Sequence, residues 1–154
     1  MATLYLSIGT NLGNRQSNME TALALIGQKV GTVKAVSGVM ETEPWGFKSA
    51  NKFLNLAVQV NTDLEPMQAL LITQGIERQI GRTAKTSVDG YKDRIIDIDL
   101  LMYDDLVLDT PDLTIPHKLM HKRRFVLEPL AEIAPQAEHP VLHKTIRQLA
   151  DEME

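Results

Sequence analysis

Apolar residues recur along this chain with two different spacings, and each spacing predicts a kind of secondary structure. Near the start every second residue is apolar, which predicts a strand with one buried face made of Leu4, Leu6 and Ile8. Over residues 15–29 the apolar positions fall at helical spacing instead, and Gly31 is expected to stop that helix. A second strand is predicted over residues 32–40, followed by an irregular loop over residues 41–47.

The middle of the chain repeats the order of strand, helix and strand. Residues 53–60 alternate sharply, with a core face of Leu54, Leu56, Val58 and Val60 and an opposite face of Phe53, Asn55, Ala57 and Gln59. Pro66 suits the first turn of a helix that should end at Gly81. A strand around Asp97 comes next, then short apolar runs and helices around residues 123–132 and 145–153.

This order of elements predicts the overall architecture. Strand, helix, two strands, helix and strand form the split βαβ arrangement. We therefore expect an α+β fold, a ferredoxin-like sandwich whose antiparallel sheet carries helices mainly on one face, with extra C-terminal helices. A length of 154 residues with 44% hydrophobic residues fits one domain over residues 1–154.

Two acids lie inside an aliphatic strand. Asp97 and Asp99 are two residues apart, so they share a face, while Ile96, Ile98, Leu100 and Met102 are predicted to face the core. Carboxylates held roughly 7 Å apart at their Cα atoms repel each other unless a cation lies between them. Oxygen ligands favour Mg²⁺, which in proteins usually also binds substrate phosphates. The alternative is an edge strand whose acids simply face water.

Charge and composition narrow the classes of function. The net charge of −4 argues against general nucleic-acid binding. Cations nevertheless gather in two clusters, which indicates either a small anionic ligand or solvated faces; they are Arg82, Lys85, Lys92 and Arg94, then Lys118, Lys122, Arg123 and Arg124. No segment approaches the roughly 20 apolar residues that span a bilayer. We expect a cytoplasmic monomer that binds neither nucleic acid nor membrane, and the lack of cysteine leaves oxygen and nitrogen as metal ligands.

Several motifs occur together in a familiar order. They are residues 6–15 (LSIGTNLGNR), residues 41–46 (ETEPWG), residues 53–55 (FLN), Arg94-x-x-Asp97-x-Asp99-Leu100-Leu101, residues 114–117 (TIPH) and residues 125–130 (FVLEPL). Through them the chain resembles the 6-hydroxymethyl-7,8-dihydropterin pyrophosphokinases of folate biosynthesis over nearly its whole length. The resemblance implies an enzyme that transfers diphosphate from ATP to the hydroxymethyl group of the pterin and releases AMP.

The resemblance also implies a role for individual residues. Asp97 and Asp99 would bind two Mg²⁺ ions, and Arg82 and Arg94 would join them as catalytic residues. The ATP site would use Gln74, Glu77, Arg82, Lys85, Arg94, Ile98, Leu100, Thr114, His117 and Arg123. The pterin site would use Thr42, Pro44, Trp45, Phe53, Asn55 and Phe125, with the ring stacked between the two phenylalanines. No side chain is an obvious strong base, so we hypothesise that Asp97 and the metal together ease deprotonation of the substrate hydroxyl.

The chain departs from the family pattern just before Arg94 and in the predicted pterin site. Lys92-Asp93 stands where many members have Gly-Pro, and Phe53 stands where tyrosine is common.

Two other classes of function remain open from the residues themselves. One is a non-catalytic ferredoxin-like binding module, regulatory or RNA-binding, although only 5% of residues are aromatic. The other is a two-metal phosphohydrolase or nuclease. The products separate these classes, because only transfer makes AMP formation depend on a hydroxymethylpterin.

Overall fold

The computed structural model describes residues 1–43, 52–81 and 95–153. The strands are β1 (Ala2–Thr10), β2 (Thr32–Val36), β3 (Met40–Thr42), β4 (Phe53–Thr62), β5 (Asp97–Tyr103), β6 (Leu108–Asp109) and β7 (Thr114–Ile115). The helices are α1 (Arg15–Lys29), α2 (Pro66–Gly81), α3 (Arg124–Ile133) and α4 (Ile146–Asp151), with a short 3₁₀ helix, η1 (Met120–Lys122). None of the helices in these ranges is long and apolar enough to cross a membrane.

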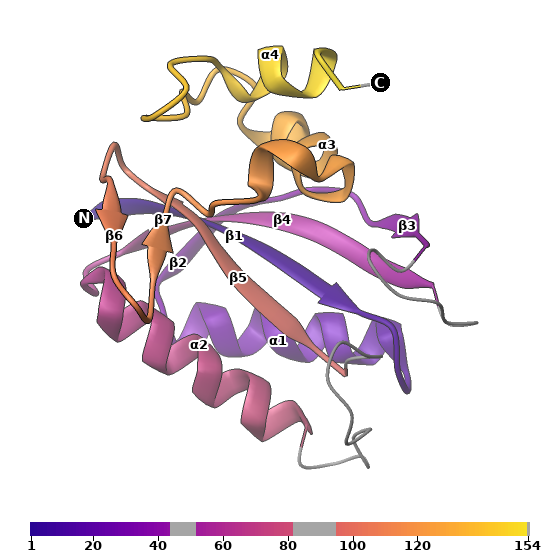
Figure 1. Cartoon of the computed structure of the whole chain (residues 1–154). Helices are drawn as coiled ribbons and strands as arrows, with labels where there is room; N and C mark the ends of the chain where they lie inside the picture. Colours follow the sequence, from indigo (N-terminus) through magenta and orange to yellow (C-terminus); the bar gives the residue numbers. More distant parts are fainter. Residues whose placement is uncertain (44–51, 82–94, 154) are drawn as a thin grey trace.

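The central sheet is antiparallel, with the strand order β2-β4-β1-β5 and with β3 also pairing with β4. Helices α1 and α2 cover one face, whereas α3 and α4 lie over the other (Figure 1). The prediction of a ferredoxin-like α+β sandwich with additional C-terminal helices is confirmed. Within the described sheet, β5 is an edge strand, so one side of its backbone faces away from the other strands.

Two hydrophobic clusters fill the space between these layers. The larger cluster joins the sheet to α1 and α2, and Leu56, Val58 and Val60 belong to it. The smaller one joins the sheet to α3 and α4, and it takes Ala57 from the opposite face of the same strand. The predicted two-sidedness of residues 53–60 is thus confirmed, although the strand extends two residues further, to Thr62.

The face predicted for Met102 is wrong. Leu6 pairs with Leu100 but Tyr5 pairs with Met102, so Leu101 is an extra residue and the register shifts at a β-bulge. One extra residue reverses the alternation of faces beyond it. Ile98 and Leu100 therefore pack under α1 and α2 as predicted, while Met102 packs with Leu101 in the cluster under α3 and α4.

The single strand predicted over residues 32–40 is also wrong, because β2 and β3 are separate. Between them, Ser37 takes over the pairing with β4: its backbone N–H donates to the Ala57 carbonyl (2.9 Å) and its Oγ accepts from the Ala57 N–H (2.8 Å). The Gly38 N–H then donates to Glu132 Oε1 (2.9 Å) on α3. Thr42, predicted in an irregular loop, lies in β3 opposite Phe53.

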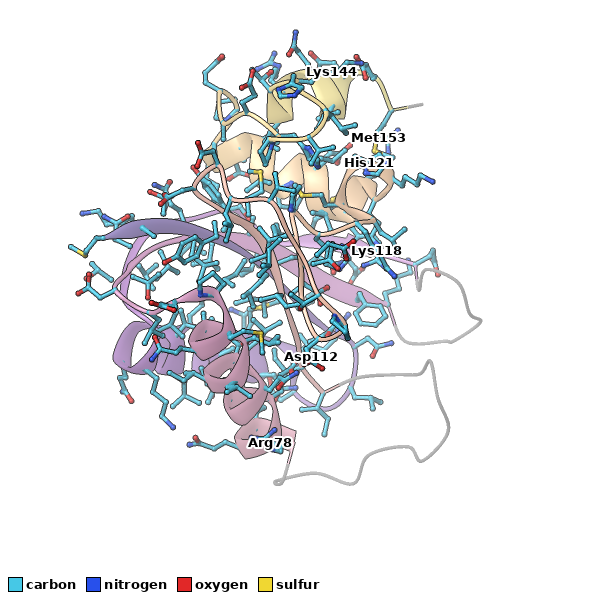
Figure 2. All side chains as sticks on the ribbon, turned by 60° about the vertical axis from the view of Figure 1, so that its left-hand side comes forward. Arg78, Asp112, Lys118, His121, Lys144 and Met153 are labelled. Carbon is cyan, nitrogen blue, oxygen red and sulfur yellow. The ribbon has the colours of Figure 1, made fainter. Side chains whose placement is uncertain are left out.

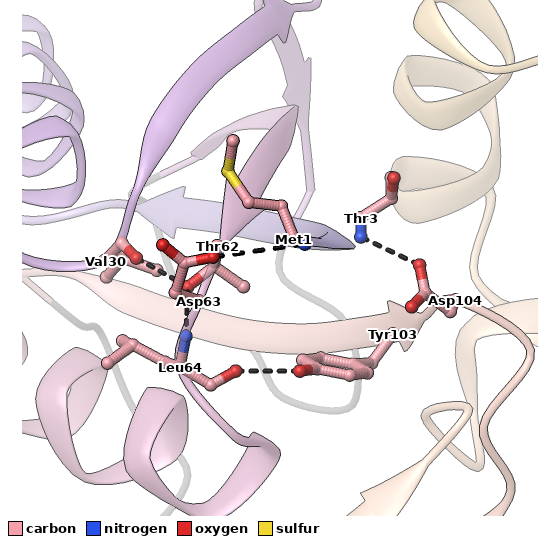
Figure 3. A network of polar contacts seen from close by, with 8 residues as sticks. All are labelled: Met1, Thr3, Val30, Thr62, Asp63, Leu64, Tyr103 and Asp104. Atoms are coloured by element: carbon pink, nitrogen blue, oxygen red, sulfur yellow. Dashed lines mark hydrogen bonds and ion pairs between the residues drawn. The ribbon is translucent and has the colours of Figure 1, made fainter.

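Polar contacts fix one end of the sheet, where β1 starts and β4 and β5 end (Figure 3). The Thr3 N–H donates to Asp104 Oδ1 (2.8 Å), and the Tyr103 hydroxyl donates to the Leu64 carbonyl (2.8 Å). The Thr62 hydroxyl donates to the Val30 carbonyl (2.6 Å). The two predicted acids lie toward the opposite end of the sheet.

Candidate functional site

The two acids share rows of the sheet with residues from β1 and β4. Asn55 pairs with Gly9 on β1, and Gly9 pairs with Asp97 on β5. In the next row of the same face, Ala57 and Asp99 flank Ser7. Directly paired residues point to the same face, so Asn55 and Asp97 stand roughly 10 Å apart at their Cα atoms, two strand spacings, with a glycine between them.

The floor between the predicted pterin and metal residues is made of small side chains. A Cβ atom on Gly9 would lie 3.0 Å from Asn55 Oδ1 and 3.5 Å from Phe53 Cδ1, so both side chains lean over this glycine. Sequence reasoning did not assign Gly9, Ser7 or Ala57 to the site. A glycine within a strand was the available signal, because it often marks a close approach of a backbone or ligand.

The described pterin residues form a supported cluster. Asn55 is only 3% exposed, and its amide Nδ2 donates to Thr42 Oγ1 (2.8 Å) on the neighbouring β3. Phe53 precedes this amide by two residues on β4 and shares its face. Phe125 lies in the first turn of α3, the helix above this face, and packs at the border of the smaller hydrophobic cluster.

Arg123 connects the acids to α3. Its Nη1 lies 4.0 Å from Asp99 Oδ2, and the two side chains are 17% and 30% exposed. Its guanidinium carbon also lies 5.6 Å from the centre of the Phe125 ring, within the range of a cation–π contact. One half-buried cation thus contacts both a predicted metal ligand and a predicted pterin residue.

The other three cations of the second cluster, Lys118, Lys122 and Arg124, are exposed. Arg124 Nη1 forms an ion pair with Glu128 (2.8 Å) along α3, and Lys118 is exposed (Figure 2). Arg123 thus contacts a predicted metal ligand, whereas Arg124 belongs to a surface pair of the helix, and the anion-binding cluster stays a prediction.

His117 lies on the outer edge of β5. Its backbone N–H donates to the Leu101 carbonyl (2.9 Å), and it follows a cis Ile115–Pro116 bond. Burial, helped by the charge of Arg123 and opposed by Asp97, lowers the pKa of His117 from its ordinary value. Its Nδ1 accepts the Leu119 N–H (3.2 Å), so the neutral ring carries its proton on Nε2, a donor suited to phosphate oxygens.

Glu77, on α2, binds the backbone of β5 at the same outer edge. Its Oε2 accepts the Ile98 N–H (2.8 Å), between the two acids in sequence. Gln74 lies about one turn before Glu77 on α2. Thr114, on β7, donates its hydroxyl to Asp109 Oδ1 (3.4 Å) on the paired strand β6. Glu77 and His117 therefore bracket the segment of β5 that contains Ile98 and Leu100, about 10 Å long for three strand residues.

Five predicted site residues lie outside the described ranges: Pro44, Trp45, Arg82, Lys85 and Arg94. Of the others, Thr42, Phe53, Asn55, Asp97 and Asp99 lie on paired strands, Glu77 and His117 bond to the backbone of β5, and Arg123 contacts both Asp99 and Phe125. In the described part of the chain, no hydrogen bond or ion pair joins Gln74 or Thr114 to this group. The pairing of Asn55 with Gly9 and of Gly9 with Asp97 joins the two predicted substrate sites directly.

The donor set of Asp97 and Asp99 fits a metal ion that also binds a ligand. In the part of the chain that the structure describes, no group of three or more histidine, aspartate or glutamate residues could hold a metal alone. Two carboxylates on one face leave coordination positions for water and for phosphate oxygens, as is usual for Mg²⁺. Such a donor set fits a metal ion that is bound together with a phosphate-bearing substrate.

A separate cavity of about 330 Å³ lies at the C-terminal end, lined by His121, Leu142, Lys144, Leu149, Glu152 and Met153. Figure 2 shows His121, Lys144 and Met153 together there. Lys144 Nζ is already paired with both oxygens of Glu152, at 2.8 and 3.0 Å. This cavity shares no residue with the predicted substrate sites.

The sequence matches the family model described as 7,8-dihydro-6-hydroxymethylpterin-pyrophosphokinase (HPPK) over residues 5–135. The chain belongs to this family. It is 45% identical to a 2-amino-4-hydroxy-6-hydroxymethyldihydropteridine pyrophosphokinase of Porphyromonas gingivalis over 136 residues, which are 88% of this chain and 92% of the relative. The corresponding protein of Bacillus subtilis is 39% identical over 87% of this chain and 79% of the relative.

Solved structures support the same fold. The HPPK-DHPS of Plasmodium falciparum crystallised with pteroate matches 98% of this chain with a TM-score of 0.81 at 20% identity. Another HPPK-DHPS structure, solved in complex with substrates, gives a TM-score of 0.78 at 18% identity. The chain spans about two fifths of these longer proteins, 42% and 43% respectively. These likenesses confirm the ferredoxin-like pyrophosphokinase fold.

Proposed function

We propose that this chain performs the reaction of its family on the face of the sheet that holds Asn55, Gly9 and Asp97. Membership of the family makes it an ATP-dependent pyrophosphokinase that transfers diphosphate to 6-hydroxymethyl-7,8-dihydropterin in folate biosynthesis. The row Asn55–Gly9–Asp97 is the observation that supports this placement, because it sets the proposed pterin-binding amide and the proposed metal-binding acid on one face, with only a glycine between them. The pterin would lie over Gly9.

The pterin site rests on an amide that is held in place. Asn55 is buried and donates to Thr42, so its carboxamide is oriented before substrate arrives. An amide can both donate to and accept from the edge of a planar heterocycle, and aromatic rings stack on its faces. We assign these stacking contacts to Phe53 from the sheet and Phe125 from α3. Pro44 and Trp45 complete the site by resemblance alone.

The nucleotide site would follow the edge of β5. Between Glu77 and His117, the backbone around Ile98 and Leu100 is the segment we assign to adenine. The neutral His117 would donate through Nε2 to a phosphate oxygen, and Arg123, already beside Asp99, would bind the same phosphates. Gln74 and Thr114 flank this edge, while Arg82, Lys85 and Arg94 are assigned by resemblance.

Asp97 and Asp99 would hold Mg²⁺, two ions in our proposal, against the ATP phosphates. Bound metal supplies charge neutralisation on the phosphate oxygens. The hydroxymethyl oxygen attacks the β-phosphorus, the bond from that phosphorus to the bridging oxygen of the α-phosphate breaks, and AMP leaves. Asp97 shares the row of Gly9, so with the pterin over Gly9 it would be the nearer of the two carboxylates, and we assign to it, together with the metal, the easing of deprotonation of the hydroxyl.

The test is AMP formation by Asp97→Asn and Asp99→Asn, each with and without the hydroxymethylpterin. Each variant should lose roughly 100-fold or more of its turnover, because electrostatic stabilisation of the transition state is removed. Asp105→Asn is the matched control, since this exposed aspartate lies in the turn after β5 and should leave turnover unchanged. Near-normal turnover in both site variants refutes the metal role, and AMP release without the pterin indicates a hydrolase.

A further inference from the structure

Ile95, just before the two acids, is hydrogen-bonded to residues at the end of β1 and in α1. Asp97 is the first residue of β5, and its pairing with Gly9 is the last rung between β5 and β1. Two residues earlier, the buried Ile95 carbonyl accepts hydrogen bonds from the Thr10 hydroxyl and from Asn18 Nδ2, the latter at 3.3 Å. The backbone of Asp97 is therefore held on both sides: β5 follows it, and the hydrogen-bonded Ile95 precedes it.

Asn18 is the centre of this anchor. Its Nδ2 lies 2.8 Å from the Leu12 carbonyl and 3.3 Å from Thr10 Oγ1, as well as reaching Ile95. Thr10 is fully buried, and Asn18 is held in the first turn of α1 by its own N–H bond to the Asn14 carbonyl (2.9 Å). One amide thus joins the end of β1, the loop after it, α1 and the entry to β5.

We propose that Asn18 and Thr10 are positioning residues for the metal-binding carboxylate of Asp97. The terminal residue of an edge strand frays readily, because it has a neighbour on one side only. A metal ligand must instead be held within about half an ångström. Two hydrogen bonds to the Ile95 carbonyl hold the backbone at the start of β5 in place. This inference rests on the proposed role of Asp97.

The experiment separates positioning from general stability. Binding of an ATP analogue with a methylene between the α- and β-phosphorus is measured by calorimetry over a series of Mg²⁺ concentrations. Pterin binding without metal and thermal unfolding are measured in parallel. The variants are Asn18→Ala and Thr10→Val, with Thr10→Ser retaining the hydroxyl. Asn14→Ala is the matched control, because it removes the cap of α1, where Asn14 Oδ1 accepts the Ser17 N–H (3.0 Å), and leaves the anchor intact.

We expect Asn18→Ala and Thr10→Val to raise the half-saturating Mg²⁺ concentration about 10-fold, the usual effect of losing a residue that orients a metal ligand. Pterin binding should stay within about twofold, and Thr10→Ser and Asn14→Ala should resemble the parent. An unchanged Mg²⁺ requirement in Asn18→Ala and Thr10→Val overturns the proposal, as does an equal change in Asn14→Ala or in pterin binding. Should Asn18→Ala fail to fold, Thr10→Val against Thr10→Ser decides alone.

Asp97→Asn serves as the reference for the proposed function. If it binds the Mg²⁺–nucleotide complex like the parent, the metal role of Asp97 fails, and the positioning role falls with it. If Asp97→Asn weakens this binding while the Asn18 and Thr10 variants do not, the proposed function stands and the positioning role alone is wrong.

Discussion

A methyl group added at Gly9 should weaken pterin binding more than nucleotide binding. The new Cβ would lie 3.0 Å from Asn55 Oδ1, below the 3.4 Å at which ordinary van der Waals contact begins, while its 3.5 Å approach to Phe53 is ordinary. The strain therefore falls on one side chain. Asn55 must move by a few tenths of an ångström, although its Nδ2 is bound to Thr42 at 2.8 Å.

The size of the effect follows from what Asn55 gives up. Weakening one hydrogen bond costs about 0.5–1.5 kcal/mol, and displacing a side chain from its rotamer costs a similar amount. Together these make about 1–3 kcal/mol, or roughly 5–150-fold in the pterin dissociation constant if Asn55 must return to its place to bind the pterin. Part of this strain is also present without ligand, so the unfolding free energy should fall by at most about 2.5 kcal/mol, because alanine within a strand recovers about 0.5–1 kcal/mol of the conformational entropy that glycine loses.

The assay is a pair of titrations of Gly9→Ala, one with the pterin and one with the ATP analogue and Mg²⁺, together with urea unfolding. Pterin binding should fall in the stated range, while nucleotide binding should remain within about twofold, since Glu77, His117 and the acids are untouched. Unaltered pterin affinity would refute the placement of the pterin over Gly9. An equal loss for both ligands would show that the methyl group disturbs the whole sheet face.

Three further changes test other parts of the structure. Gly31→Ala should lower the unfolding free energy by about 1–3 kcal/mol in urea, because its Cβ would lie 2.1 Å from a backbone oxygen of β4. Gly27→Ala, at an exposed position inside α1, should instead raise the unfolding free energy by about 0.5–1 kcal/mol. Changes of the same sign in both variants would contradict this. Glu77→Ala should weaken nucleotide binding about 3–10-fold by leaving the Ile98 N–H without its acceptor, while Glu77→Gln retains most binding; identical affinities for both variants would exclude this role. Burial, and then two neighbouring histidines, lower the pKa of His139 below its ordinary 6.5. Its contribution to the stability of the fold is therefore present above about pH 6.5 and is lost as the pH falls below that value. An NMR titration that gives His139 a pKa at or above 6.5 would contradict this.

The His139 prediction also rests on geometry. Its Nδ1 accepts the N–H groups of Val141 (3.3 Å) and Leu142 (3.1 Å), which a protonated ring cannot do. The groups that face it are His121, whose ring centre lies 6.2 Å away, and His143 from the same loop. Acid should therefore loosen the turn that leads into α4.

Local patterns in the sequence predicted the elements well where one hydrophobic face controls the structure. The bounds of α1 and α2 agree with the structure, because helical spacing, the Asn14 region and Pro66 mark their limits locally. The shared face of Asp97 and Asp99 follows from strand alternation alone. Family motifs added predicted roles that no spacing could supply, such as the pterin contact proposed for Phe125.

Where a long-range contact decides, local patterns failed. The strand predicted over residues 32–40 is divided because Ser37 bonds to Ala57, a residue twenty positions away. Arg123 and Arg124 are adjacent in sequence, yet of the two only Arg123 contacts an acid of the site, since it precedes α3 with an extended backbone while Arg124 begins the helix and pairs with Glu128 along it.

The sequence by itself determined the order of elements, the fold class, the paired acids and the family of this protein. The tertiary structure alone decided that Met102 changes face, that Gly9 separates Asn55 from Asp97, and that Asn18 holds the entry to β5. The reason is physical. Periodicity and capping act over a few neighbouring residues, whereas register, bulges and anchors depend on strands that meet across most of the chain.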